Sequence, residues 1–500
     1  MTRLTRCTVV LLLLLISALP LQAANLDEKV IEHTFKNGLK LLMVERHSSP
    51  TVSAWIRFKV GSAHERSDER GIAHLLEHML FKGTRTLGTR DYAAEAPLLD
   101  KIEQTAQLLL AEEARGDQAD KARLASLRAE LEQLEKQAGQ YVIKDEFFEL
   151  YARHGGSGYN AFTSKDGTTY LISLPANKLE LWAAIESDRM KNPVLREFYT
   201  ERSVVMEERR RSYDAEPAAK LWETFVAAAY NAHPYGQPII GWMPDIQQLS
   251  RTKAEQFLKR YYAPNNAVIA VVGAIKPNEV IQLVERYFGD IPPGTPVPEL
   301  AIREEPQRGE RRIEVIGDAQ PELVIGFHKT ALGAPEDYVF DLITAILSHG
   351  RTSRLYRSLV LEKQLATQVS VFDAPGQRYP NLFVLYATPR APHTAAELEQ
   401  ALLAELERLK NEPVSPRELQ RVMNRLEFEE ARRMGTNGGL ARNLTEYEAT
   451  VGSWRYLTSY TSRMAQITPA DIQRVARQFL TRENRIVGTL VTQKAGGTLQ

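Results

Sequence analysis

The most informative stretch of the chain is HLLEHMLFKGT, which runs from His74 to Thr84. The residues around it, from Ser67 to Lys82, predict a helix, because apolar side chains recur at helical spacing and form one stripe. At about 100° per residue, His74, Glu77 and His78 fall together on the opposite side of this helix. The apolar stripe consists of Ile72, Leu75, Leu76 and Met79.

The spacing of these three polar residues, HxxEH, is that of a zinc site. Two imidazoles at i and i+4 on one helix face can chelate one tetrahedral zinc ion, while a carboxylate between them can reach a water molecule without ligating the metal. HxxEH is the reverse of the better-known order HExxH. We therefore predict His74 and His78 as metal ligands and Glu77 as the catalytic base. Two unrelated surface histidines are the alternative; a core histidine is disfavoured because the trio avoids the apolar stripe.

A catalytic zinc takes a third protein ligand and leaves a fourth position for water. The segment Phe198 to Ser212 offers Glu201 and Glu208, seven residues apart on an apolar helix stripe. Carboxylates that face inward among valines are costly unless a cation or hydrogen bonds compensate. We predict Glu208 as the third ligand and Glu201 as a residue that supports the site. An ion-paired helix face is the alternative. The stripe consists of Phe198, Val204 and Val205, and the nearby arginines are Arg202, Arg209, Arg210 and Arg211.

The totals of the chain are those of an ordinary globular protein with several domains. It has 500 residues, and its 63 basic side chains balance its 63 acidic ones. A balanced charge gives no general attraction to polyanions. We therefore expect neither a nucleic acid nor an anionic membrane as the main partner.

Residues 1–24 have the layout of a secretory signal peptide. Two arginines precede an apolar run from Thr8 to Leu21, and alanines follow at positions 23 and 24. We expect cleavage after one of these alanines and a periplasmic or secreted protein without a stable membrane span. An uncleaved anchor is the alternative, although the run is short for a span. The only cysteine, Cys7, lies in this segment, so the mature chain would carry no disulfide.

The remaining sequence repeats one order of elements in two halves. A helical pattern from Ala254 to Tyr262 precedes the apolar run Val268 to Val272. In the same way, Pro469 to Leu480 precedes Ile486 to Val491. Only two copies are visible, so the pattern indicates a duplicated domain and not a solenoid.

We predict an α+β fold of two homologous domains, each a mainly antiparallel sheet covered by helices. The first, catalytic domain spans residues 25–290 and the second spans residues 310–500. Between them, residues 291–309 are rich in proline and predict a semi-rigid linker. Residues 94–141 predict a helical hairpin inserted in the first domain. We expect this hairpin to be either a solvated decoration or a docking arm for a partner subunit.

The motifs resemble the pitrilysin and mitochondrial processing peptidase family of zinc metallopeptidases. HLLEHMLFKGT is similar to that family's active-site helix, and ERSVVMEE, Glu201 to Glu208, is similar to the segment whose second glutamate ligates zinc. NAFTS, HPYGQPIIG and SRLY, which begin at Asn160, His233 and Ser353, extend the resemblance. It implies Zn²⁺ as the cofactor and two homologous domains per chain. It also implies a cavity enclosed by four such domains when two chains, or two halves of a longer chain, face each other.

Two features depart from the family's pattern. The hairpin lengthens the chain between His78 and Glu208, which need not disturb the site because loop-closure entropy grows slowly with length. The family's substrate-binding Arg and Tyr, seven apart after SRLY, are replaced by Val360 and Thr367. We therefore expect a heterodimer with a homologous subunit that supplies the missing pair. A homodimer that dispenses with the pair is the alternative.

The expected function is that of a zinc-dependent endopeptidase that hydrolyses extended peptides or unfolded polypeptides. The stretch Tyr159 to Thr163 predicts a strand that could add a peptide backbone as an extra strand. We predict Asn160 and Ala161 as its substrate-binding residues, with an ordinary core strand as the alternative. The competing class is a noncatalytic peptide-binding or assembly subunit. The intact set of predicted zinc ligands and base argues against that class.

Overall fold

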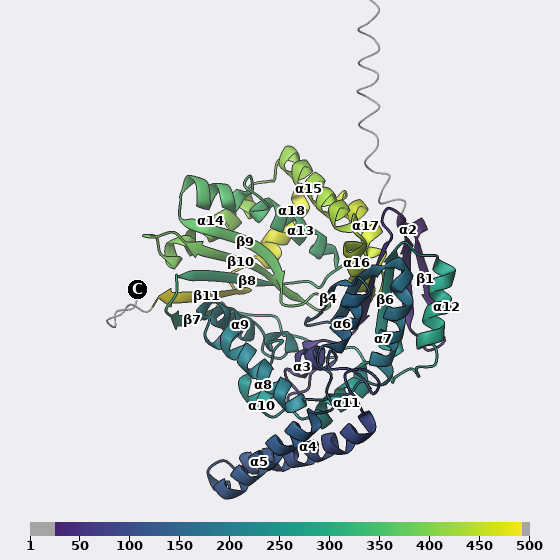
Figure 1. The fold of residues 1–500 in the computed structure, drawn as a ribbon. Helices are drawn as coiled ribbons and strands as arrows, with labels where there is room; N and C mark the ends of the chain where they lie inside the picture. The colour runs from purple at the N-terminus through teal and green to yellow at the C-terminus, as the bar shows by residue number, and fades with distance from the viewer. Residues whose placement is uncertain (1–25, 493–500) are drawn as a thin grey trace, which may run out of the picture.

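The chain folds around two β-sheets, one from each half of the sequence, in a computed structural model that describes residues 26–492 (Figure 1). The predicted signal peptide, residues 1–24, and Cys7 lie outside the described residues. We call residues 26–290 the first half and residues 310–492 the second half. Within the described residues, no helix combines the length and the apolar content that crossing a membrane requires.

The first half contains the six strands of the first sheet and most of the helices around the predicted site. Its strands are β1 (Val30–Thr34), β2 (Lys40–Glu45), β3 (Thr51–Phe58), β4 (Ser157–Thr163), β5 (Thr168–Pro175) and β6 (Ala267–Gly273). Its helices are α2 (Leu26–Lys29), α3 (Ile72–Met79), α4 (Tyr92–Glu113), α5 (Lys121–Ala138), α6 (Glu146–Arg153), α7 (Leu179–Lys191), α8 (Phe198–Arg209), α9 (Pro217–Ala229), α10 (Met243–Gln247), α11 (Arg251–Tyr261) and α12 (Pro277–Phe288).

The second half builds a five-stranded sheet with its own helices. Its strands are β7 (Arg311–Gly317), β8 (Glu322–Lys329), β9 (Ala366–Ala374), β10 (Asn381–Pro389) and β11 (Arg485–Thr492). Its helices are α13 (Pro335–Ser348), α14 (Ala395–Asn411), α15 (Pro416–Met434), α16 (Asn437–Thr450), α17 (Tyr456–Met464) and α18 (Pro469–Phe479).

The two sheets share one strand plan. The first has the order β1-β2-β6-β3-β5-β4 and the second the order β7-β11-β8-β10-β9. In each sheet a single pair is parallel, β2 with β6 and β7 with β11, and the other pairs are antiparallel. The strands β6 and β11, which follow α11 and α18, therefore occupy equivalent places. This confirms the predicted α+β fold of two homologous, mainly antiparallel units.

Each sheet is covered on one face by a helix from the opposite half. Leu440 and Leu444 of α16 are buried against the first sheet, where they meet Val268 of β6. In return, Leu221 and Phe225 of α9 are buried against the second sheet. The strand β6 is buried along its whole length because helices cover both of its faces. Cover on both faces explains why β6 is a continuous apolar run without alternation.

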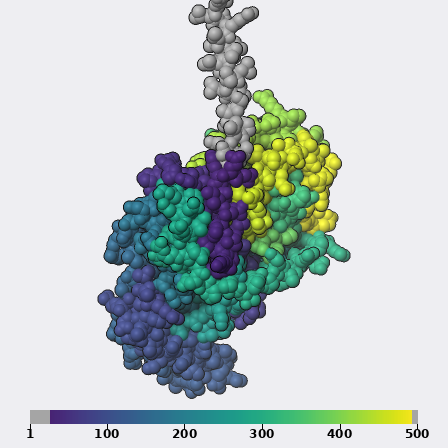
Figure 2. All heavy atoms as spheres, turned by 90° about the vertical axis from the view of Figure 1, so that its right-hand side faces the viewer, coloured from purple at the N-terminus to yellow at the C-terminus, as the bar shows by residue number. Residues whose placement is uncertain are grey.

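The predicted hairpin is present as α4 and α5, which extend at the bottom of Figure 1 and form the lower lobe in Figure 2. Its tip is the short 3₁₀ turn Gly116–Gln118. The helix α5 is mostly exposed, whereas α4 contributes Leu99, Ile102 and Ala106 to the first core. The hairpin is therefore anchored in the body of the protein through α4 and through the end of α5, where Ala138 joins the same core.

Candidate metal and peptide site

The helix α3 carries the HxxEH residues and is shorter than the predicted span of 67–82, since it covers only Ile72–Met79. Its start is fixed by Gly71, whose φ of 88° lies in the left-handed region that favours glycine. The carboxylate of Glu65 accepts hydrogen bonds from the backbone N–H groups of Gly71 and Ala73, both at 2.9 Å. The predicted stripe of Ile72, Leu75, Leu76 and Met79 is fully buried, which holds the opposite face of α3 toward a hollow.

The two histidines of α3 converge on Glu208 of α8. The Nε2 atom of His74 lies 3.8 Å from Oε1 of Glu208, and Nε2 of His78 lies 3.7 Å from Oε2. These separations exceed a hydrogen bond. They approach the distance of about 3.4 Å between two ligands of a tetrahedral zinc ion with bonds near 2.1 Å. One ligand atom from each of the three residues lies within 4.8 Å of the others, so the donor set fits a single metal ion. We call these three side chains, His74, His78 and Glu208, the metal cluster.

The electrostatic surroundings of the two imidazoles also suit a bound cation. Burial, together with the neighbouring His78, lowers the pKa of His74 to about 4, so this imidazole is neutral and keeps a lone pair. Burial alone would lower the pKa of His78 as well, but the carboxylates of Glu201, Glu208 and Glu77 outweigh it and raise this pKa. Three carboxylates around one imidazole are electrostatically favourable for a bound cation.

Glu201 orients His78 from behind. Nδ1 of His78 donates to Oε1 of Glu201 at 2.9 Å, and Nζ of Lys82 lies 2.7 Å from Oε2. Because Glu201 holds Nδ1, Nε2 is the ring atom that faces Glu208 and would ligate a metal ion. Burial would raise the pKa of Glu201, but the bonds from His78 and Lys82 outweigh it and lower this pKa to about 2. Glu201 is thus a charged partner that fixes the ring of His78.

One detail of the predicted α8 stripe is wrong. The side chain of Val204 is 47% exposed and does not belong to the buried face. That face instead follows Phe198, Val205 and Arg209, with Glu201 beside them. Glu208 lies at the edge of this face with its side chain 35% exposed, so its carboxylate faces the two imidazoles and not the valines. Arg209 is held inside by its ion pair with buried Glu223, at 2.8 Å.

Glu77 faces the same hollow between the imidazoles and strand β4. Oγ1 of Thr163 donates a 2.6 Å hydrogen bond to Oε2 of Glu77. Burial raises the pKa of Glu77, and the hydrogen bond from Thr163 opposes this only in part. Thr163 lies within the NAFTS motif but was not among the predicted site residues. Its hydroxyl ties the carboxylate to the strand and leaves Oε1 for other partners.

The strand β4 forms the outer edge of the first sheet and the wall of this hollow. Among residues 26–492 it pairs only with β5, so its other edge is open to the rest of the described chain. Asn160 is exposed and lines the hollow of about 530 Å³ together with Glu77 and His78. Ala161 is buried opposite Tyr170 of β5, so only its backbone faces the open edge. The structure therefore places Asn160 beside the metal cluster, while the side chain of Ala161 packs in the core.

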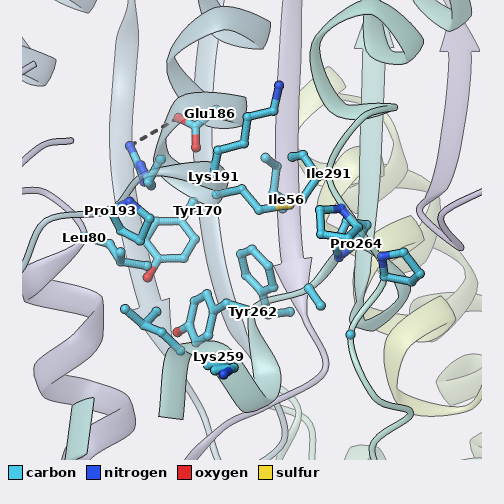
Figure 3. A pocket seen from close by; sticks show the side chains of 18 of the residues that line it. Ile56, Leu80, Tyr170, Glu186, Lys191, Pro193, Lys259, Tyr262, Pro264 and Ile291 are labelled. Carbon is cyan, nitrogen blue, oxygen red and sulfur yellow. Dashed lines mark ion pairs between the residues drawn. The ribbon is translucent and has the colours of Figure 1, made fainter. Parts of the chain in front are cut away.

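A second hollow lies beside Ile56 and Tyr170, on the face of the first sheet that α3 also covers (Figure 3). It has a volume of about 660 Å³, and none of the predicted site residues lines it. Its buried ion pair, Glu186 with Arg189, is drawn as a dashed line in Figure 3. Arg189 donates to the hydroxyl of Tyr159 on β4 and lies 5.6 Å from the ring centre of Phe81, which follows α3. No local sequence pattern predicts a role for Arg189. Through Tyr159 and Phe81 it connects β4 with the segment that follows α3.

The two positions that depart from the family's Arg and Tyr lie in the second half. Val360 belongs to a short π-helical segment, Tyr356–Glu362, and is buried in the second core. Thr367 is exposed on β9, where its hydroxyl donates to the carbonyl of Thr388 at 3.3 Å. Neither lines the hollow beside the metal cluster.

Two family descriptions match the chain. "Insulinase (Peptidase family M16)" matches residues 40–100 and 131–242, and "Peptidase M16 inactive domain" matches residues 248–426. The break between the first two segments falls within the hairpin of α4 and α5. The matches thus include all of α3 and α8, which carry the metal cluster.

Related proteins align along nearly the whole chain. "Zinc protease PqqE" of Helicobacter pylori is 26% identical over 454 residues, which cover 89% of each protein. The crystal structure of a protease from Helicobacter pylori has a TM-score of 0.77 at 25% identity, covering 92% of this chain and 99% of that one. The periplasmic protease PqqL from Escherichia coli has a TM-score of 0.68 at 18% identity, covering 93% of this chain and 48% of that one. With two M16 matches in tandem and relatives over this length, the chain belongs to the pitrilysin family of peptidases, family M16.

Proposed function

We propose that the chain is a zinc-dependent endopeptidase that hydrolyses extended peptides or unfolded polypeptides. In this proposal His74, His78 and Glu208 are the metal ligands, and Glu77 is the catalytic base. The observation that carries it is the convergence of both Nε2 atoms on the two oxygens of Glu208, at 3.8 and 3.7 Å, beside a buried carboxylate. Relatives described as zinc proteases support the choice of metal.

The side chains divide the work of peptide hydrolysis as follows. A zinc ion in this site would supply positive charge that acidifies water and polarises a carbonyl group. Glu77 accepts a proton from water through Oε1 while Thr163 holds Oε2, and it then passes the proton to the departing amine. A pKa raised by burial suits this exchange, because a base with a pKa closer to neutrality can both take and return a proton. Glu201 keeps His78 in one tautomer throughout.

The open edge of β4 is the proposed peptide-binding strand. An extended peptide can pair its backbone with an exposed sheet edge, which selects for extended or unfolded chains over folded ones. The open edge of β4 lies beside the metal cluster, because Thr163 donates a hydrogen bond to Glu77 and Asn160 lines the hollow that Glu77 and His78 also line. Asn160 would bond the peptide through its side chain and Ala161 through its backbone.

We also propose that activity depends on a second, homologous subunit. Val360 and Thr367 stand where related enzymes carry the substrate-gripping Arg and Tyr, and buried Val360 offers no polar group. A partner with that pair would complete the site, which favours a heterodimer; a homodimer that dispenses with the pair is the second arrangement. We further propose that the protein is periplasmic or secreted, which the predicted leader at residues 1–24 and the periplasmic relative PqqL support.

A noncatalytic subunit is the competing function, favoured by the same missing Arg and Tyr. Metal analysis and peptide hydrolysis with the wild type and with Glu77→Gln separate the two. We expect zinc in both proteins and a loss of cleavage of roughly 100-fold or more in the variant. Glu207→Gln is the matched control, because Glu207 adjoins the ligand Glu208 but is exposed.

Three results would count against the proposal. Bound zinc without cleavage, even after a homologous partner is added, identifies the noncatalytic subunit. Wild-type protein that takes up no zinc, or His78→Ala protein that binds it as well as the wild type, overturns the metal assignment.

A further inference from the structure

A third hollow, lined mainly by polar side chains, lies on the opposite face of the first sheet from α3. It encloses about 660 Å³ between the end of α15 and the first turns of α16, beside Gln377. The helix α16 packs on the face of Trp55 and Val268, whereas α3 packs on the face of Ile56 and Ile269. Charged side chains dominate its lining: Arg432, Arg433, Arg442, Glu429 and Glu446.

The donors in this hollow outnumber the acceptors. Arg442 pairs with Glu446 at 3.4 Å, and Glu429 forms an ion pair with Arg425, which does not line the hollow. Arg432 makes no ion pair with any residue in the range 26–492. Asn443 lines the hollow with only 7% of its surface exposed, and its Nδ2 atom has no hydrogen-bond partner among the described residues. A buried donor of this kind calls for an acceptor.

The hollow adjoins the strand that the peptide would join. The guanidinium of Arg442 lies 5.8 Å from the ring centre of Phe162, a residue of β4. Successive side chains of an added strand point to opposite faces of a sheet. Every second side chain of the peptide would therefore face the metal cluster, and the side chains between them would face Phe162 and Arg442.

We propose that the hollow between α15 and α16 is a subsite for a carboxylate of the bound peptide, recognised by Arg442, Arg432 and Asn443. This inference rests on the proposed peptidase function, because it assumes a peptide paired with β4. The carboxylate is either an acidic side chain of the peptide or its C-terminal group. Guanidinium groups bind carboxylates with directed, charge-assisted hydrogen bonds, and an amide N–H adds a further donor.

Peptide binding to the full-length Glu77→Gln protein tests the subsite without cleavage. The probes are short fluorescent peptides that place Glu or Gln at each position in turn, with an amidated C-terminus. A second set lacks acidic residues and differs only in a free or amidated C-terminus, which separates the two sources of the carboxylate. If the carboxylate is a side chain, we expect Glu peptides to bind about tenfold more tightly than Gln peptides at one position or at alternating positions. If it is the C-terminal group, we expect the free acid to bind about tenfold more tightly than the amide.

Variants identify the residues responsible. Arg442→Gln should bring the ratio of the dissociation constants of the neutral and the acidic peptide close to one. Arg442→Lys should retain part of the preference for the acidic peptide. Arg421→Gln is the matched control, because Arg421 is an exposed arginine on α15 that does not line the hollow.

The proposal is overturned if Glu and Gln peptides bind equally at every position, or if the preference survives Arg442→Gln unchanged. Equal weakening of both peptides by Arg442→Gln also overturns it, since that result assigns Arg442 to the support of β4 alone. Failure of the peptidase function has a different signature. Wild-type protein then cleaves none of the peptides, while the binding ratios still decide whether the subsite exists.

Discussion

The position of His78 depends on a single carboxylate behind it. Glu201 accepts the Nδ1 proton at 2.9 Å and is itself held by Lys82. Partners of this kind orient a ligating imidazole, and their loss typically weakens metal binding 10- to 100-fold. We therefore predict that Glu201→Gln lowers zinc affinity by about that factor, measured by competition with a chromophoric chelator.

The control for this prediction is Glu207→Gln, on the same helix. Glu207 is exposed and pairs only with Arg210, so its loss should leave zinc affinity within about twofold of the wild type. Equal affinity in the Glu201→Gln and wild-type proteins would show that His78 is held by the backbone of α3 alone.

A buried charge cluster in the second half makes stability depend on pH. Nζ of Lys329 lies 2.6 Å from Asp337 and also pairs with Asp373, while Tyr460 donates to Asp341 at 2.8 Å. One cation thus faces three carboxyl groups. Burial, together with the charge of Asp337, raises the pKa of Asp341 to about 7.

This shift predicts a loss of stability as the pH rises. The unfolded chain releases the Asp341 proton near its ordinary pKa of 3.8, whereas the folded chain keeps it until about 7. Between these values the folded state binds more protons, so the free energy of unfolding falls by up to about 1.4 kcal/mol per pH unit. Urea unfolding from pH 5 to pH 8 should show this fall in the wild type and a flatter profile in Asp341→Asn. Parallel profiles would contradict it, and exposed Asp117→Asn serves as the control.

Among the elements, α9 belongs to the first half in sequence but is packed against the second sheet. A Cβ atom on Gly326 of β8 would lie 2.6 Å from Cζ of Phe225, whose ring is fully buried. We predict that Gly326→Ala destabilises the protein by about 1–3 kcal/mol through this clash, measured by denaturant unfolding. In a Phe225→Leu background the penalty should shrink, because the shorter side chain makes room.

The double-mutant cycle isolates this contact from other effects of the substitutions. Gly309→Ala is the control, since nothing lies within 4 Å of a Cβ at that position. Strictly additive effects of Gly326→Ala and Phe225→Leu would mean that α9 does not sit over β8 in solution.

Features that depend on residues close together in the sequence could be predicted, whereas features that depend on contacts between distant segments could not. The faces of α3 could be predicted because residues at i and i+4 meet on one helix whatever surrounds it. Glu208 could be paired with them through its spacing from Glu201 and the family resemblance. The exposure of Val204 could not be predicted, because the hollow beside it is formed by β4 and α3, which are distant from it in sequence. Periodicity shows that α9 and α16 have an apolar face, but it does not show that each covers the sheet of the other half.

For the whole molecule, this exchange of helices makes the two halves mutually dependent. Each half supplies a helix whose large apolar side chains are buried only in the other half, among them Leu221, Phe225, Leu440 and Leu444. The N-terminal strands also touch the C-terminal helices, where Arg455 pairs with Glu32 at 2.6 Å; these ends lie side by side in Figure 2. The segment between the halves is therefore not what keeps them together.

Cutting that segment should leave the halves joined. At about 2 kcal/mol per buried Leu or Phe, four such side chains provide about 8 kcal/mol of association before ordering costs, and the pairs around Glu32 add to it. We predict that a protease site inserted after exposed Gly309 yields two fragments that co-elute in gel filtration at micromolar concentration and separate only in denaturant. The same cut in a chain with Leu440→Asp and Leu444→Asp should release the fragments, because charges would then face the apolar first sheet. Separate elution of the unmodified fragments would mean that the peptide connection, and not the exchanged helices, holds the metal cluster and the second sheet in one molecule.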